Sequence, residues 1–92
     1  MPNLTDLEIT KLCAQAMGQA TDYDGWCYAY DPLHDDAQAM ALVKRFLLCI
    51  LARNKYWRVM SREIDSPEGI NKDLNRAICE CVAKMQKAKA AA

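Results

Sequence analysis

The chain has 92 residues, 52% of them hydrophobic and 26% charged, which is typical of one small globular domain and excludes a disordered segment. Its longest apolar run, residues 46–52, is far shorter than the roughly 20 residues that cross a bilayer. The N-terminus lacks the basic, apolar and small-residue order of a signal peptide. We therefore expect a cytoplasmic protein with no membrane partner.

The formal net charge is zero, but the charge is unevenly spread. Residues 1–43 hold seven acids and one base, a sum of −6, whereas residues 44–92 hold five acids and eleven bases, a sum of +6. Such a distribution indicates either a dipolar surface that binds a partner or two halves that fold together and cancel the difference. We expect the second.

The first predicted element is a helix with a capping box. In Thr5-Asp6-Leu7-Glu8 the Thr hydroxyl can accept from the Glu8 amide, and the Glu8 carboxylate can accept from the Thr5 amide. Apolar residues then recur at steps of three and four, as on one helix face, and Gly18 is placed to end the helix. These apolar residues are Ile9, Leu12, Cys13, Ala16 and Met17.

The segment "WCYAY", residues 26–30, alternates aromatic and small residues and predicts a strand. Asp31-Pro32 ends it and begins a second helix, with Asp31 as N-cap and Pro32 in the first turn. Lys44 and Arg45 suit the C-terminal end of that helix. The following "LLCILA", residues 47–52, fits either more helix or a short buried strand.

The C-terminal half predicts a strand, a loop and a long helix. "KYWRVM", residues 55–60, alternates as a strand does. Ser66-Pro67-Glu68-Gly69 is typical of a loop, with an edge strand through Glu63 and Ile64 before it. An apolar stripe predicts a helix over residues 71–87, followed by a frayed tail at 88–92.

This order predicts an α+β fold, a single domain over residues 1–92. We expect an alpha-beta-alpha sandwich with a short sheet of two to three strands packed by three helices. Because a two-stranded sheet is marginal by itself, a third strand or a partner chain is expected.

The five cysteines follow no metal-binding spacing. They are Cys13, Cys27, Cys49, Cys79 and Cys81. Their number is odd, no paired C-x2-C units occur, and two residues of a C-x-C pair on a helix do not face each other. We interpret all five as small buried hydrophobes in a reducing compartment.

Three stretches together resemble the phage ABA sandwich domain family of small phage and prophage proteins. They are "LTDLEITKLCAQAMG", "YDPLHDDAQAMALVKRF" and "LNRAICECVAKMQ", and they cover roughly half the chain in the expected order. The resemblance implies an alpha/beta/alpha layered fold, a phage or prophage origin and no established activity. It supplies no catalytic residues, and the strand region between the second and third helices is shorter here than is usual in the family.

The acidic segment Asp31-Pro32-Leu33-His34-Asp35-Asp36 is the first candidate site. Its His and Asp side chains have the chemistry of a Mg²⁺, Mn²⁺ or Zn²⁺ site, but the spacings of a calcium loop and of a zinc protease are absent. A helix start explains the same residues, because Asp35 with Gln38 resembles a capping pair and acids suit a helix N-terminus. We favour the helix start.

The basic segment 53–62 is the second candidate site. Basic residues are interleaved with aromatic ones, a pattern that can bind nucleic acid by phosphate contacts and base stacking. On a strand, however, these side chains are divided between two faces, and edge strands carry such charges simply to prevent pairing. The possible interaction surface comprises Arg53, Lys55, Tyr56, Trp57, Arg58 and Arg62.

From origin and size we expect a non-catalytic protein-interaction module with no cofactor and no metal. Its partner would be an unidentified host or phage protein in the bacterial cytoplasm. A homodimer is also expected, because an interface between two copies would bury apolar surface that one small core leaves exposed. The alternative is a nucleic-acid-binding accessory protein that uses residues 53–62. A metal-dependent enzyme built on His34 and its neighbouring aspartates is the least favoured interpretation.

Overall fold

The computed structural model describes residues 5–18, 30–62 and 67–91. In chain order the elements are α1 (Asp6–Ala16), α2 (Asp36–Phe46), β1 (Cys49–Ala52), β2 (Trp57–Met60), β3 (Glu68–Asn71) and α3 (Leu74–Ala91). The three strands form an antiparallel sheet in the order β1-β2-β3. The predicted small α+β domain, with three helices and a short sheet, is confirmed.

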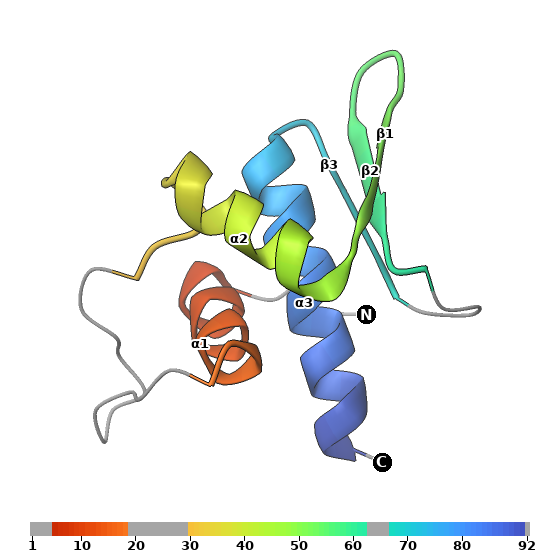
Figure 1. The fold of residues 1–92 in the computed structure, drawn as a ribbon. Coiled ribbons are helices and arrows are strands. Elements are labelled where there is room, and N and C mark those ends of the chain that lie inside the picture. Colours follow the sequence, from red (N-terminus) through yellow and green to blue (C-terminus); the bar gives the residue numbers. More distant parts are fainter. Residues whose placement is uncertain (1–4, 19–29, 63–66, 92) are drawn as a thin grey trace.

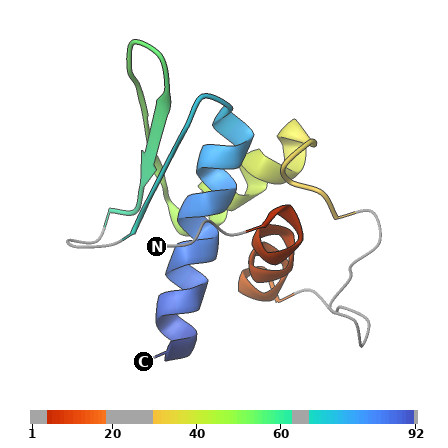
Figure 2. The ribbon, with the colours of Figure 1, turned by 180° about the vertical axis from the view of Figure 1, so that it is seen from behind.

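Helix α3 is the centre of the molecule (Figure 1). It contacts β2 and β3 on one side and α1 and α2 on the other, so the sheet is an outer layer among the described elements, as the view from behind also shows (Figure 2). Residues 77–79 and 81–83 of α3 are buried, and most of them are Ala or Cys. Small side chains let the neighbouring elements approach the helix axis closely.

Gly69 is where β3 approaches α3. A Cβ atom at this position would lie 2.8 Å from the backbone nitrogen of Cys81, 2.9 Å from the carbonyl carbon of Ala77, and nearer still to the Ala77 carbonyl oxygen. Ordinary contacts between carbon atoms are about 3.5–4.0 Å. Only glycine therefore fits between the strand and the helix.

The strand register gives the sheet two different faces. Ile50, Val59 and Gly69 are cross-strand partners and face α3, where Val59 is fully buried. Because side chains alternate along a strand, the adjacent row of Leu51, Arg58 and Ile70 faces the opposite way. The described helices cover only the first of these faces, so the alpha-beta-alpha layer order expected from the sequence is not found among the described elements.

Helix α1 begins and ends as predicted. Thr5 is the N-cap, with φ −74° and ψ 162°, and its Oγ1 accepts from the Glu8 amide at 3.2 Å. Gly18 follows the helix with φ +72°, the left-handed conformation that glycine adopts at low cost. The Thr5 half of the predicted capping box is confirmed.

The start of α2 is corrected from Asp31 to Asp35. Residues 32–34 form a turn, in which the His34 amide donates to the Asp31 carbonyl at 3.1 Å. Asp35 is the N-cap, and its Oδ1 accepts from the Gln38 amide at 3.1 Å. Pro32 and Leu33 are buried in this turn. We attribute the later start of the helix to the packing of these two side chains.

Helix α2 ends at Phe46 with Leu47 as its C-cap, which answers the open question of residues 47–52. Leu47 has φ 52° and ψ 53°, a left-handed conformation that costs a residue with a side chain roughly 1–2 kcal/mol. The reversal leaves Leu47 exposed, buries Leu48 and leads directly into β1. The segment is therefore a helix end followed by a strand.

Three predictions in the C-terminal half are corrected. Glu68 and Gly69 belong to β3 rather than to a loop, because they pair with Met60 and Val59 of β2. Helix α3 begins at Leu74 instead of residue 71, since the Asn71 side chain accepts from the Asp73 amide at 3.0 Å and makes a turn there. The helix continues to Ala91, so residues 88–91 are helical where a frayed tail was predicted.

The cysteine interpretation holds at three positions and is wrong at one. Cys13, Cys79 and Cys81 are buried, whereas Cys49 is exposed on β1, because it shares the sheet face of Leu51 rather than that of Ile50. Cys27 lies outside the described residues. So do the predicted edge strand at residues 63–64 and most of the predicted strand at 26–30, of which only Tyr30 is described, as a buried residue outside any strand.

Candidate interaction face of the sheet

The sheet face opposite α3 is the strongest candidate site, and we call it the outer sheet face. It comprises two cross-strand rows, Leu51-Arg58-Ile70 and Cys49-Met60-Glu68. Leu51 is 39% exposed and Ile70 is 50% exposed. Exposed apolar side chains that lie together on one face are typical of binding surfaces, whereas scattered ones are not.

An ion pair lies at the centre of the outer sheet face. Arg58 Nε donates to Glu68 Oε2 at 2.9 Å, and Arg58 Nη2 donates to Glu68 Oε1 at 2.6 Å. This two-bond geometry raises the pKa of Arg58 and lowers the pKa of Glu68, so both groups are charged at neutral pH. A charged pair with fixed geometry inside an apolar surface adds orientation to a contact.

The turn between β1 and β2 carries three of the six predicted surface residues. The turn is closed by the Arg53 amide, which donates to the Tyr56 carbonyl at 2.9 Å. Arg53, Lys55 and Tyr56 are all exposed there. The turn lies at one end of the sheet (Figure 1), so these three residues make that end basic and aromatic.

The other three predicted residues do not lie in this turn. Trp57 lies on the same sheet face as Val59, opposite the outer sheet face, and packs against the buried core. Arg58 is bound to Glu68, and the exposed Arg62 follows the far end of β2. The structure therefore does not assemble the six residues into one basic platform.

Five of the six residues of the outer sheet face were missed from the sequence, and one of them, Glu68, was assigned to a loop. Leu51 and Cys49 were part of the ambiguous apolar run, and Met60 was seen only as one side of an alternating strand. Ile70 stands in "EGIN", which shows no alternation at all. Its exposure follows from the pairing of β3 with β2 and from the contact of Gly69 with α3.

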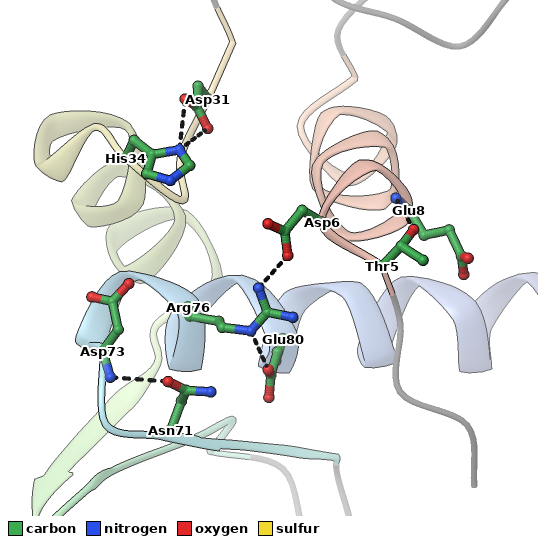
Figure 3. A network of polar contacts seen from close by, with 9 residues as sticks. All are labelled: Thr5, Asp6, Glu8, Asp31, His34, Asn71, Asp73, Arg76 and Glu80. Atoms are coloured by element: carbon green, nitrogen blue, oxygen red, sulfur yellow. Dashed lines mark hydrogen bonds and ion pairs between the residues drawn. The ribbon is translucent and has the colours of Figure 1, made fainter.

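The acidic candidate site is divided among several structural roles. His34 Nδ1 lies 2.9 Å from an Asp31 carboxylate oxygen (Figure 3), Asp35 caps α2, and Asp36 accepts from the Asn75 side chain at 2.7 Å. Within residues 5–18, 30–62 and 67–91, no three His, Cys, Asp or Glu side chains are placed to hold a metal ion together. The helix-start interpretation of this segment is confirmed, with Asp35 as the cap.

Arg76 connects the first turn of α1 to α3. Its guanidinium donates to the carboxylate of Asp6 and, through Nε at 3.0 Å, to Glu80 Oε1 (Figure 3). The hydrogen bond to Asp6 is the main cause of a raised pKa of Arg76. These two contacts help to position α1 against α3.

Comparisons with known proteins do not assign the chain to a family. A scan against protein-family models and searches of curated proteins and of solved structures found no significant match. Among the helices of the described residues, none has the length and apolar character needed to cross a membrane.

Proposed function

We propose that the chain is a small phage or prophage accessory protein that acts in the bacterial cytoplasm by binding another protein, without catalysis. The observation that carries the proposal is the outer sheet face, where Leu51 and Ile70 are exposed beside the Arg58–Glu68 pair. The origin rests on the resemblance of the sequence to the phage ABA sandwich domain family.

The residues of the outer sheet face indicate what chemical properties its partner should have. Leu51 and Ile70 call for an apolar surface, and covering what remains exposed of each contributes about 1 kcal/mol. Arg53, Lys55 and Arg62 lie at the two ends of β2 and are exposed, so the edge of the partner's surface should be acidic. The expected partner is a protein with an apolar patch surrounded by carboxylates.

An affinity experiment with two variants tests this proposal. Tagged wild-type protein, a Leu51→Ala/Ile70→Ala variant and a Leu7→Ala variant are incubated with nuclease-treated lysate of infected and uninfected bacteria, and bound proteins are quantified by mass spectrometry. Leu7 is 50% exposed on α1 and is the matched control. A partner of the outer sheet face is retained by wild type and Leu7→Ala but not by the double variant.

The affinity of the purified partner makes the result quantitative. Loss of two contributions of about 1 kcal/mol each weakens binding roughly thirtyfold, which calorimetry measures. Equal affinity of wild type and the double variant would contradict the proposal, as would recovery of no protein by either.

A nucleic-acid-binding function is the second candidate, favoured by Arg53, Lys55 and Tyr56 in one turn. Against it, Arg58 is neutralised by Glu68 and Trp57 packs on the opposite face. Fluorescence anisotropy with labelled single-stranded DNA and RNA separates the two functions. If nucleic acid is the ligand, Arg53→Glu/Lys55→Glu abolishes binding, Lys11→Glu/Lys44→Glu does not, and affinity falls steeply with salt.

A further inference from the structure

A groove lies between the N-terminal turns of α2 and α3. It has a volume of about 350 Å³ and is lined by Asp36, Met40, Asp73, Leu74, Asn75 and Ile78. The Asn75 side chain donates to Asp36 Oδ1 at 2.7 Å and so connects the two helices across it. Met40 is 41% exposed, and Ile78 is buried beneath. The groove thus has an apolar floor between two carboxylates.

This end of the molecule is negatively charged. Asp36 and Asp73 line the groove, Asp31 and Asp35 precede α2, and Lys72 is the base next to Asp73. Four carboxylates and one ammonium leave three negative charges. The two helix N-termini offset only about one of them, since each is equivalent to roughly half a positive charge. A cationic group is therefore attracted to the groove.

The opposite end of α3 carries a net positive charge from two lysines, of which the negative end of the helix dipole offsets about half a unit. Lys87 and Lys89 are exposed there, with the small Ala88 between them, and the last turns of α3 extend beyond α1 in both views (Figures 1 and 2). Lys84 is already bound, because its Nζ donates to the Glu68 carbonyl at 3.0 Å. This end offers two lysines and little bulk.

Few direct ion pairs join the two oppositely charged halves of the sequence within the described residues. Among the ion pairs of the described residues, only Asp6–Arg76 joins an acid of residues 1–43 to a base of residues 44–92. Direct ion pairs between the described residues therefore neutralise little of the charge difference between the two halves. A separation of charge into opposite ends makes two copies of the chain complementary to each other.

The groove and the lysines cannot meet within one copy. Asp73 and Lys89 are 16 residues apart along one helix, which is about 24 Å at 1.5 Å per residue. We propose that the groove between α2 and α3 receives the lysine-bearing end of α3 from a second copy of the chain. Lys87 and Lys89 then lie near Asp36 and Asp73, and Ala88 packs against Met40 and Leu74. The contact is head-to-tail, so it closes into a ring or continues into a chain.

Sedimentation velocity of the purified chain over a concentration series tests the contact. The wild type should associate at low salt and dissociate as salt is raised, because exposed ion pairs are screened. Lys87→Glu/Lys89→Glu should weaken association at least about tenfold, since two surface ion pairs are lost and like charges replace them. These positions are exposed at a helix end, so the variant keeps its fold.

Charge exchange gives the sharper result. Asp36→Lys/Asp73→Lys, once shown to fold by circular dichroism, should also lose self-association, and a mixture of the two charge-reversed variants should recover it. The Lys87→Glu/Lys89→Glu result stands alone if the aspartate variant does not fold.

The control is Leu51→Ala/Ile70→Ala, which should associate like wild type. A protein that is monomeric at every concentration and salt overturns the inference. Association that survives lysine reversal, or that is lost only with Leu51 and Ile70, overturns it as well. This experiment uses the chain alone, so its failure leaves the proposed partner of the outer sheet face unaffected.

Discussion

Gly69→Ala tests the contact on which the fold depends most. The added Cβ would be 2.8 Å from the Cys81 nitrogen and 2.9 Å from the Ala77 carbonyl carbon, against the roughly 3.5–4.0 Å of ordinary contacts. The neighbours are helix backbone and cannot rotate away, so β3 must separate from α3. Overpacking typically costs 1–3 kcal/mol, and we expect about 3 kcal/mol or more here because no side chain can yield.

That loss is large for a chain of this size. At 4–8 °C per kcal/mol for a domain below 100 residues, a cost of about 3 kcal/mol lowers Tm by roughly 12–24 °C. Circular dichroism during heating and in urea measures it. Gly18→Asn is the control, because Gly18 has φ +72° and a Cβ added there would meet no atom within 4 Å, and Asn accepts that conformation at a cost below about 1 kcal/mol. If Gly69→Ala melts within a few degrees of wild type, the close approach of β3 to α3 is refuted.

Helix capping, the ion pair and the cysteines give three further predictions. Asp35→Ala removes the N-cap of α2 and should lower the free energy of unfolding, measured in urea, by about 1 kcal/mol. Asp31→Ala, at an exposed position, is the control. An equal loss of stability for both variants would contradict Asp35 as the cap. The pKa of Glu68 is lowered in the folded state, so its ionisation stabilises the fold above its ordinary pKa, and this stabilisation is lost as pH falls through the lowered value. The free energy of unfolding of wild type should therefore fall more steeply on acidification than that of Glu68→Gln. Parallel pH profiles of the two proteins would count against the Arg58–Glu68 ion pair. Burial raises the pKa of Cys81 to about 11, whereas Cys49 is exposed. Iodoacetamide should therefore alkylate Cys49 in the native protein and Cys81 only after unfolding, which peptide mass spectrometry measures. Rapid labelling of Cys81 in the native protein would contradict its burial in the core.

Local signals predicted the helices better than the strands. The Thr5–Glu8 capping pair needs only residues three apart, so it could be recognised directly and the structure contains it. The same reasoning found the Asp35–Gln38 pair but placed the start of α2 too early. The burial of Pro32 and Leu33 depends on distant residues and has no local signal.

The candidate site was predictable only in part. Arg53, Lys55 and Tyr56 stand close together in the chain and remain together in the turn between β1 and β2. The Arg58–Glu68 pair joins residues ten apart on neighbouring strands, and Glu68 was assigned to a loop. Without the strand register, no pattern in the sequence brings these two side chains together.

The amino-acid order alone was enough for the fold class, the capping of α1 and the separation of acidic from basic residues along the chain, because each depends on composition or on neighbours within one helical turn. Packing was needed to place Gly69 against α3, to turn Leu47 into a left-handed helix end and to expose Leu51 and Ile70 on one face. These features arise from contacts between residues far apart in the chain, whose energies outweigh local preference. The sheet face that we propose binds a partner exists only once those contacts have formed.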